Sequence, residues 1–331
     1  MTFPEACQSR AVEMNPFKIS SNFVILLSAS MIRRRPFLLS TAVLTTLLAA
    51  APRIMAQTET RPFVHNGYNR PYLIHRPAHL PARPAVVFML GGIGSTAKFT
   101  SESFNWTSES DRNGFLVVFP EPVATQTDQP ADRKNITFWE MKGSRTHRLA
   151  PGALPVDDDG YLMAVLRDVL KREHADPKRV FFAGFSSGSG AVQLLASHHS
   201  KEIRGIAAVA TPLMEPPLKL DRPLAVLYIH GDNDEQLSGF EVNSPQFATT
   251  PHGNWVTWGY LNGCRIQSAE KTSWGVQFSW QECRDNVPVV ADFVANFGHE
   301  WAGSLDSKKP PPAGPDFTDM AWQFFASVHT K

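Results

Sequence analysis

The sequence predicts an α/β fold in which a mostly parallel sheet is covered by helices on both faces. Six largely apolar runs of strand length alternate with segments of helical periodicity, and five of the six are continuously apolar, Asp292 being the exception. Strands buried on both faces need continuous apolarity, and parallel strands need crossover connections, which are usually helical. The runs cover residues 85–90, 115–119, 180–183, 206–210, 224–229 and 289–294.

The first 56 residues have the pattern of an export signal. Arg33–Arg35 precede the apolar run 37–51, and small residues lead to a cleavage position after Ala56. The arginines fit a twin-arginine signal and also ordinary secretion. The run is shorter than the roughly 20 residues that span a bilayer, so we expect cleavage rather than a stable membrane span. We therefore expect a signal that starts near Met31 and a single secreted or periplasmic domain over residues 57–331.

Charge argues against a nucleic-acid partner. The whole chain has a formal charge of +1, and without the six basic and two acidic residues of the first 56 the remainder is at −3. Such a remainder gives no basic footprint for phosphates. The oligomeric state is left open by the sequence.

Three cysteines are present, and Cys7 falls in the segment that we expect to be removed. Cys264 and Cys283 then remain as a pair in an exported chain, which favours a disulfide between them. Two buried free thiols are the alternative.

Smaller elements can be placed along the chain. Phe63–Asn66 and Tyr72–His75 are predicted to pair as a hairpin around Gly67. Asp157–Asp159 are expected to cap a helix, because carboxylates near a helix N-terminus accept from its free N–H groups; a cation site is the alternative. Helices are predicted over 157–170, 187–199 and 316–328.

The segment Gly184–Gly188 matches G-x-S-x-G between a predicted strand and a predicted helix. This is the context in which that motif lifts a serine into a cleft on a sharp, strained turn. The central Ser186 is the candidate nucleophile, and the N–H of Ser187 is a candidate oxyanion donor.

Candidate partners of Ser186 follow two later strands in the chain order Ser, Asp, His of an α/β hydrolase. His299 is the candidate base, because a serine hydroxyl needs a base to accept its proton. A carboxylate must orient that imidazole, and both Asp232 and Asp234 are available in one turn, where one aspartate is usually needed for the turn itself.

With these motifs the chain resembles the polyhydroxybutyrate depolymerase and feruloyl esterase group of secreted α/β hydrolases, from about Pro62 to Phe325. The group's His-Gly-x-x-Asp turn matches residues 230–234, and its Gly-His-x-Trp segment matches residues 298–301. The resemblance implies that Asp234 is the acid and His299 the base.

The oxyanion loop departs from the group's pattern, because Leu90 stands where a histidine is usual. The hole uses backbone N–H groups, so Gly92 can still supply the second donor. Trp139 and Trp301 are expected to line the ester-binding cleft, and core packing is the alternative for Trp139.

The expected activity is that of a secreted serine esterase with Ser186, His299 and Asp234 as its triad. Its substrates would be small or polymeric esters of hydroxycinnamate, acetyl or hydroxyalkanoate type, and the mechanism implies no metal or organic cofactor. A serine peptidase on the same fold and a non-catalytic surface-binding protein are the alternatives.

Overall fold

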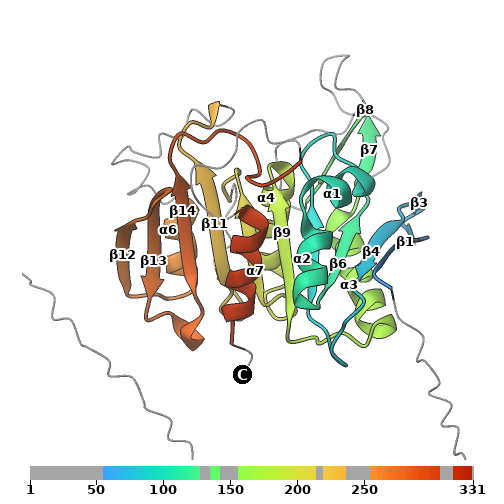
Figure 1. The fold of residues 1–331 in the computed structure, drawn as a ribbon, viewed down its shortest axis with the longest axis horizontal. Coiled ribbons are helices and arrows are strands. Elements are labelled where there is room, and N and C mark those ends of the chain that lie inside the picture. The colour runs from blue at the N-terminus through green and yellow to red at the C-terminus, as the bar shows by residue number, and fades with distance from the viewer. Residues whose placement is uncertain are drawn as a thin grey trace, which may run out of the picture. The chain divides into compact units, whose positions relative to one another are not determined.

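Ten strands of the described residues form one sheet (Figure 1). Its six central strands, from β6 to β14, are parallel, and antiparallel pairing adds two strands at each end. In spatial order they are β1 (Gln57–Arg61), β4 (Tyr72–Arg76), β6 (Leu116–Pro120), β5 (Val86–Leu90), β9 (Val180–Phe185), β10 (Gly205–Val209), β11 (Ala225–Gly231), β14 (Val289–Val294), β13 (Gly275–Gln281) and β12 (Ile266–Lys271).

The computed structural model describes residues 55–126, 135–141, 156–213, 219–235, 254–305 and 316–329. All of them belong to one compact unit, residues 51–331. The predicted export signal and Cys7 lie outside the described residues. Within these ranges, no helix combines the length and the apolar character that a membrane span requires.

The predicted fold class is confirmed. The six apolar runs correspond to β5, β6, β9, β10, β11 and β14, and all residues of β5, β6, β10 and β11 are buried. Helices cover both faces of these strands, as the continuous apolarity requires. The carboxyl ends of the six parallel strands therefore meet at one edge of the sheet.

Two hydrophobic clusters hold the helices to the sheet. One face carries α3 (Asp158–Arg172), α4 (Ser187–His198) and α6 (Asn254–Leu261). The other carries α1 (Ala97–Ser103), α2 (Trp106–Asn113) and α7 (Phe317–Ser327), which lie toward the viewer in Figure 1. The three predicted helices correspond to α3, α4 and α7.

The acidic triplet ahead of α3 divides its carboxylates among separate partners. Asp157 caps the helix by accepting from the N–H of Gly160 at 2.8 Å. Asp158 is buried and pairs with Arg70, whose side chain is 2% exposed. Asp159 contacts two histidine rings at the C-terminal end of α4, those of His198 and His199. The expected cap is confirmed at Asp157, and the other two carboxylates link α3 to its neighbours.

The predicted hairpin of residues 63–66 with 72–75 is wrong. Asn66 and Gly67 both have positive φ, 47° and 82°, and close a shorter hairpin between β2 (Val64–His65) and β3 (Tyr68–Asn69). Two residues in this conformation make the tight turn that two-residue hairpins favour. As a result β4 is left free to pair with β1 and β6.

A separate two-stranded ribbon consists of β7 (Val123–Gln126) and β8 (Asn135–Phe138). It extends from the β6 side at the upper right of Figure 1. Trp139 directly follows β8, so the base of this ribbon brings an indole toward the edge formed by the carboxyl ends of the parallel strands.

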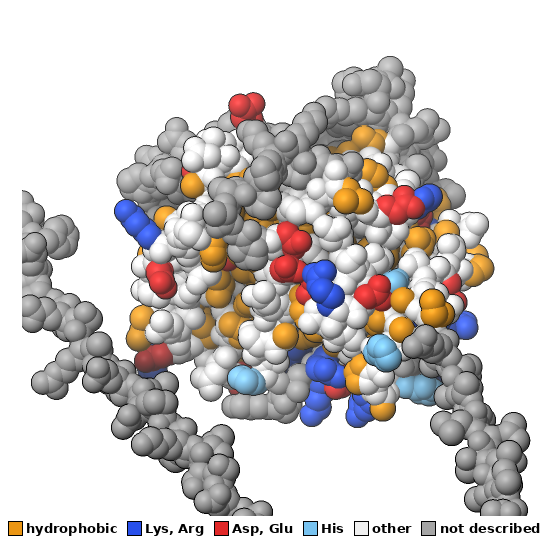
Figure 2. Space-filling view, in the orientation of Figure 1, with side chains coloured by type: hydrophobic (Ala, Val, Ile, Leu, Met, Phe, Trp, Pro, Cys, Tyr) orange, Lys and Arg blue, Asp and Glu red, His pale blue; other side chains and the backbone are white. Residues whose placement is uncertain are grey.

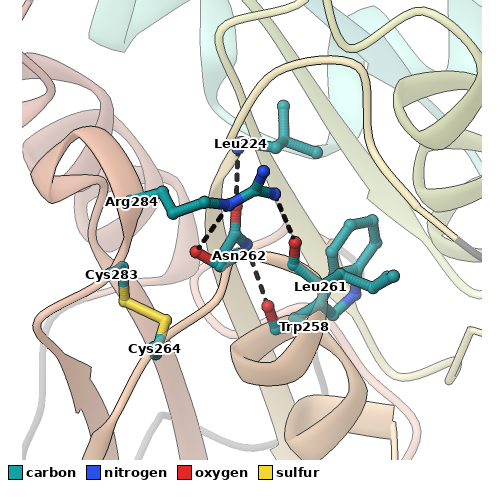
Figure 3. Close-up of a disulfide and its surroundings, with 7 residues drawn as sticks. All are labelled: Leu224, Trp258, Leu261, Asn262, Cys264, Cys283 and Arg284. Carbon is teal, nitrogen blue, oxygen red and sulfur yellow. Dashed lines mark hydrogen bonds between the residues drawn. A yellow bond between two sulfur atoms is a disulfide. The ribbon is translucent and has the colours of Figure 1, made fainter.

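The far end of the sheet is an antiparallel hairpin of β12 and β13, here called the antiparallel flank. A disulfide joins Cys264, just before β12, to Cys283, just after β13, so the predicted pairing is confirmed (Figure 3). Beside it, the Asn262 side chain accepts from the N–H of Leu224 at 2.7 Å and donates to the carbonyl of Trp258 at 2.9 Å. The base of the flank is therefore tied to α6 and to the start of β11.

Candidate active site

Ser186 occupies the turn between β9 and α4. Its backbone has φ 54° and ψ −121°, a conformation that costs a non-glycine residue about 1–3 kcal/mol. The N–H of Ser186 donates to the carbonyl of Val209 at 3.0 Å, which ties the turn to β10. The strained turn places this serine at the carboxyl-end edge of the sheet.

The glycines of the motif are required by close backbone contacts. A Cβ on Gly184 would lie 2.3 Å from the carbonyl oxygen of Gly188, and one on Gly188 would lie 2.2 Å from the carbonyl oxygen of Leu90. Both distances are far below any normal contact. A side chain at Gly184 would force the turn itself open, and one at Gly188 would push the turn away from β5. The sequence pattern thus reflects packing as well as flexibility.

The structure brings Ser186, His299 and Asp234 together from three separate turns. His299 Nε2 lies 2.9 Å from Ser186 Oγ, and His299 Nδ1 lies 2.7 Å from Asp234 Oδ2. In a neutral imidazole, Nδ1–H donates to the carboxylate and Nε2 accepts from the hydroxyl. The His299 side chain is 11% exposed and the Asp234 side chain is 1% exposed. The arrangement can take a proton from Ser186 and stabilise the imidazolium that results.

Asp232 and Asp234, which the residues alone leave as alternatives, have different surroundings. Asp232 is exposed, and its Oδ1 accepts from the backbone N–H of Asn296. It therefore connects the turn after β11 to the turn after β14. Asp234 is the buried carboxylate that contacts His299.

A second histidine lies beside this carboxylate. His230, at the end of β11 and 4% exposed, has Nδ1 2.7 Å from the Tyr228 hydroxyl and Nε2 3.6 Å from Asp234 Oδ2. Burial lowers the pKa of His230, and nearby Asp234 only partly opposes this. This shift favours the neutral form of the ring. The sequence assigned His230 to the turn of residues 230–234. The His-Gly-x-x-Asp motif was the signal that could have placed its ring beside Asp234.

Two backbone groups are placed to serve as oxyanion donors. Ser187 is the first residue of α4, so its N–H belongs to the helix end that lacks intrahelical acceptors. Gly92 lies against the serine, since a Cβ built on it would be 3.1 Å from Ser186 Cβ and 3.6 Å from Ser186 Oγ. Both residues lie beside Ser186, and their role as oxyanion donors stays a prediction.

The two tryptophans expected to line the cleft are core residues instead. Trp301 is 1% exposed, and its Nε1 donates to Thr318 Oγ1 of α7 at 3.0 Å. Trp139 is 4% exposed, and its Nε1 donates to the carbonyl of Gly91 at 3.0 Å. The prediction that Trp301 lines the substrate cleft is wrong, because Trp301 packs in the core against α7. For Trp139, the structure shows the alternative, which is packing in the core. Large aromatic rings gain more from this burial than from exposure.

Comparison with known families and proteins identifies the group. A family model described as Phospholipase/Carboxylesterase matches residues 74–250. A bifunctional acetylxylan esterase/xylanase of Neocallimastix patriciarum is 22% identical over 213 residues, which cover 58% of this chain and 28% of that enzyme. A protein of Nocardia uniformis subsp. tsuyamanensis that is named as an esterase, NocK, is 25% identical, and the match covers 78% of each chain. The chain thus spans less than a third of the first relative and most of the second.

A solved structure agrees on the fold. The acetyl xylan esterase from Aspergillus awamori superposes with a TM-score of 0.52 at 14% identity, covering 82% of this chain and 99% of that one. At this identity the likeness concerns the fold alone. Together with the family match over more than half of the residues, it confirms the resemblance to esterases of the α/β hydrolase fold. The chain belongs to the phospholipase/carboxylesterase family of hydrolases.

Proposed function

We propose that this protein is an exported serine esterase that hydrolyses carboxylic esters through an acyl-enzyme. The observation that carries the proposal is the continuous series from the buried Asp234 through His299 to Ser186, with contacts of 2.7 and 2.9 Å. Family membership supports the esterase activity, and the serine mechanism rests on this geometry.

In the first half of the reaction, Ser186 Oγ attacks the ester carbonyl carbon while its proton passes to His299 Nε2. The carbonyl electron pair moves onto oxygen, where the N–H groups of Gly92 and Ser187 donate to it. Collapse of this species breaks the bond to the alcohol, which leaves with the proton from His299. The product is an ester between the acyl group and Ser186.

In the second half, water attacks the acyl-enzyme and gives a proton to the same His299 nitrogen. Collapse then releases the carboxylic acid and returns the proton to Ser186 Oγ. Asp234 keeps Nδ1 protonated throughout and stabilises the imidazolium in both halves. The described residues contain each of these groups, and the proposed chemistry calls on no cofactor.

For the substrate we propose carboxylic esters with a short acyl group, acetyl esters of polysaccharides first. One named relative is a bifunctional acetylxylan esterase/xylanase, and this is the basis of the choice. Ile93 directly follows Gly92 and is 41% exposed, so an apolar side chain is available beside the oxyanion donor. Hydroxycinnamate and hydroxyalkanoate esters are the other acyl classes to be compared.

For the location we propose secretion or periplasmic export. The disulfide between Cys264 and Cys283 supports it, because such bonds persist in oxidising compartments. The signal pattern before Gln57 supports the same conclusion from sequence.

The test is the chain from Gln57 onward compared with its Ser186→Ala variant on aryl acetates, acetylated xylan, hydroxycinnamate esters, a polyhydroxyalkanoate and a peptide anilide. Loss of the nucleophile is expected to lower kcat about 10⁴- to 10⁶-fold, as in other serine hydrolases. An aryl phosphonate should add one phosphonyl group to the wild-type mass and none to the variant.

Ser189→Ala is the matched control. Ser189 belongs to the same segment, but its hydroxyl donates to the carbonyl of Thr211 at 2.8 Å. Loss of this bond should lower the free energy of unfolding by about 1 kcal/mol. We expect the kcat of the variant to stay within about threefold of the wild-type value. Ester turnover that survives Ser186→Ala would overturn the nucleophile assignment. Peptide cleavage faster than ester cleavage would favour a peptidase.

A further inference from the structure

The oxyanion loop, defined here as residues 91–95, contains a peptide unit between Gly91 and Gly92 whose orientation no side chain of these two residues restricts. Gly91 and Gly92 are consecutive glycines, and neither carries a Cβ that would restrict rotation of the peptide plane between them. If that plane turned over, the carbonyl of Gly91 would replace the N–H of Gly92 at the position beside Ser186. A carbonyl there would repel an oxyanion, so the orientation of this peptide decides whether the hole exists.

One side chain fixes that orientation. Trp139 Nε1 donates to the carbonyl oxygen of Gly91 at 3.0 Å, in a buried contact between positions 48 residues apart. The peptide is trans, and in a planar trans peptide the C=O and the N–H point in opposite directions. Holding the carbonyl of Gly91 on the Trp139 side therefore turns the N–H of Gly92 away from the indole. Gly92 lies beside Ser186, since a Cβ built on it would be 3.1 Å from Ser186 Cβ.

The segment that carries Trp139 is itself bonded to the same loop. The N–H of Gly94 donates to the carbonyl of Thr137 at 2.8 Å, and Thr137 Oγ1 donates to the carbonyl of Ser95 at 2.7 Å. With the indole bond, residues 137–139 contact the oxyanion loop at three points. The loop is therefore held by the base of the β7–β8 ribbon, and the Gly91 end depends on the indole.

Tryptophan suits this position for two reasons. Its ring is 4% exposed and belongs to the hydrophobic cluster that also contains Leu90, so packing fixes the direction of the N–H. The indole nitrogen is only a donor and carries no charge, so it can satisfy a buried carbonyl without the desolvation cost of a cation. A phenylalanine would fill most of the same space and leave the carbonyl of Gly91 unpaired.

We propose that Trp139 is a positioning residue of the esterase, which sets the oxyanion donor of Gly92 through its bond to the carbonyl of Gly91. This inference rests on the proposed function, because it assigns a role within the same site. Trp139 acts through the loop and does not touch the reacting atoms. Its loss should therefore weaken stabilisation of the transition state more than binding of the ester.

The experiment is steady-state kinetics of Trp139→Phe on an aryl acetate, in the chain from Gln57 onward. Removal of an oxyanion donor costs about 10²- to 10³-fold in kcat, and a donor that is only misoriented part of the time should cost about 10- to 100-fold. KM should stay within about threefold. The rate of phosphonylation of Ser186 by an aryl phosphonate should fall in parallel with kcat, since that reaction also builds charge on an oxygen in the hole.

Trp258→Phe is the matched control. Its indole also makes one buried hydrogen bond, to Gln193 Oε1 at 3.1 Å, and it lies in the same hydrophobic cluster but not on the oxyanion loop. Both variants lose one buried bond of about 1 kcal/mol, so similar shifts in urea midpoint are expected, and only Trp139→Phe should lose kcat.

The outcomes separate the two proposals. If the wild type is active and Trp139→Phe has an unchanged kcat, the positioning role is overturned while the esterase proposal stands. Equal loss of kcat in Trp258→Phe would also overturn it, because general loosening of the core would explain both. A wild type that neither hydrolyses esters nor reacts with the phosphonate would overturn the proposed function itself.

Discussion

The edge of the sheet that carries Ser186, Asp234 and His299 and the antiparallel flank at its far end are held by different forces. The strands that lead to the site are buried on both faces, and all seven residues of β11 are inaccessible. Every residue of β12 is exposed, and β13 is mostly half-buried. The flank is closed by a covalent bond between Cys264 and Cys283. Packing on two faces fixes the site, and a cross-link fixes the flank.

This difference separates activity from stability. Each proposed catalytic side chain stands within a few residues of the end of a buried strand, so its position depends on the strand ladder and on short turn contacts. The flank reaches the site indirectly, through the pairing of β13 with β14 and through the contact of Asn262 with the residue before β11. Changes at the edge should therefore remove activity with little change in stability, and changes in the flank should do the reverse.

The largest expected effect is that of Asp234→Asn at the edge. An amide keeps the shape but cannot stabilise the imidazolium, and kcat should fall about 10³- to 10⁴-fold, as expected when the acid of such a triad is neutralised. The fall is measured on an aryl acetate, with the unfolding midpoint in urea as a check that the fold is retained.

Asp232→Asn is the control for that variant, because it lies in the same turn but its oxygen accepts from the N–H of Asn296, which an amide oxygen can also do. Its kcat should stay within about threefold of the wild-type value. The loss of one charge-assisted bond costs about 1–3 kcal/mol of folding free energy, and it should lower stability rather than catalysis. Equal losses in the two variants would contradict the choice of Asp234 as the acid.

Next in size is the removal of the disulfide by the double change Cys264→Ala and Cys283→Ala. The bond closes a loop with a sequence separation of 19, and chain-entropy arguments assign about 3 kcal/mol of folding free energy to a loop of that length. Urea unfolding of the variant should show this loss, while kcat on an aryl acetate stays close to that of the wild type. A fall in kcat without a loss of stability would mean that the flank supports the site directly.

The same two regions differ in how far sequence reasoning reaches. The six parallel strands were predictable because burial on both faces imposes a continuous apolar run, and the nucleophile turn was predictable because its glycines are dictated by contacts of Gly184 and Gly188 with nearby backbone. The strand β12 was not predicted, because its residues are mostly polar and all exposed. An exposed edge strand leaves no apolar period in the sequence.

Within the site, the residues that local sequence left open or misplaced are those whose roles depend on distant partners. Asp232 and Asp234 share one turn, and they differ in their partners from the turn after β14, which are the N–H of Asn296 for Asp232 and the ring of His299 for Asp234. Trp139 and Trp301 donate to acceptors that lie 48 and 17 positions away in the sequence. Such partners follow from tertiary packing, which a local pattern does not contain.

The smallest expected effect concerns Asp292, at the seam between the two regions. It belongs to β14, is 1% exposed, and accepts from Gln277 of β13 at 2.9 Å. Burial raises the pKa of its carboxyl to about 6. Because the folded-state pKa lies above the unfolded value of about 3.9, the charged carboxylate opposes folding, and this cost is absent below about pH 4 and complete above about pH 6.

Asp292→Asn should therefore be more stable than the wild type at pH 8, by about 2–3 kcal/mol, and equal to it near pH 4. An amide oxygen still accepts from Gln277, so the seam stays paired, although the bond is weaker without the charge. Urea unfolding at both pH values measures the difference, and kcat at pH 8 should not change. A variant that is less stable at both pH values would show that the charge-assisted bond to Gln277, rather than the burial of the carboxylate, dominates at the seam.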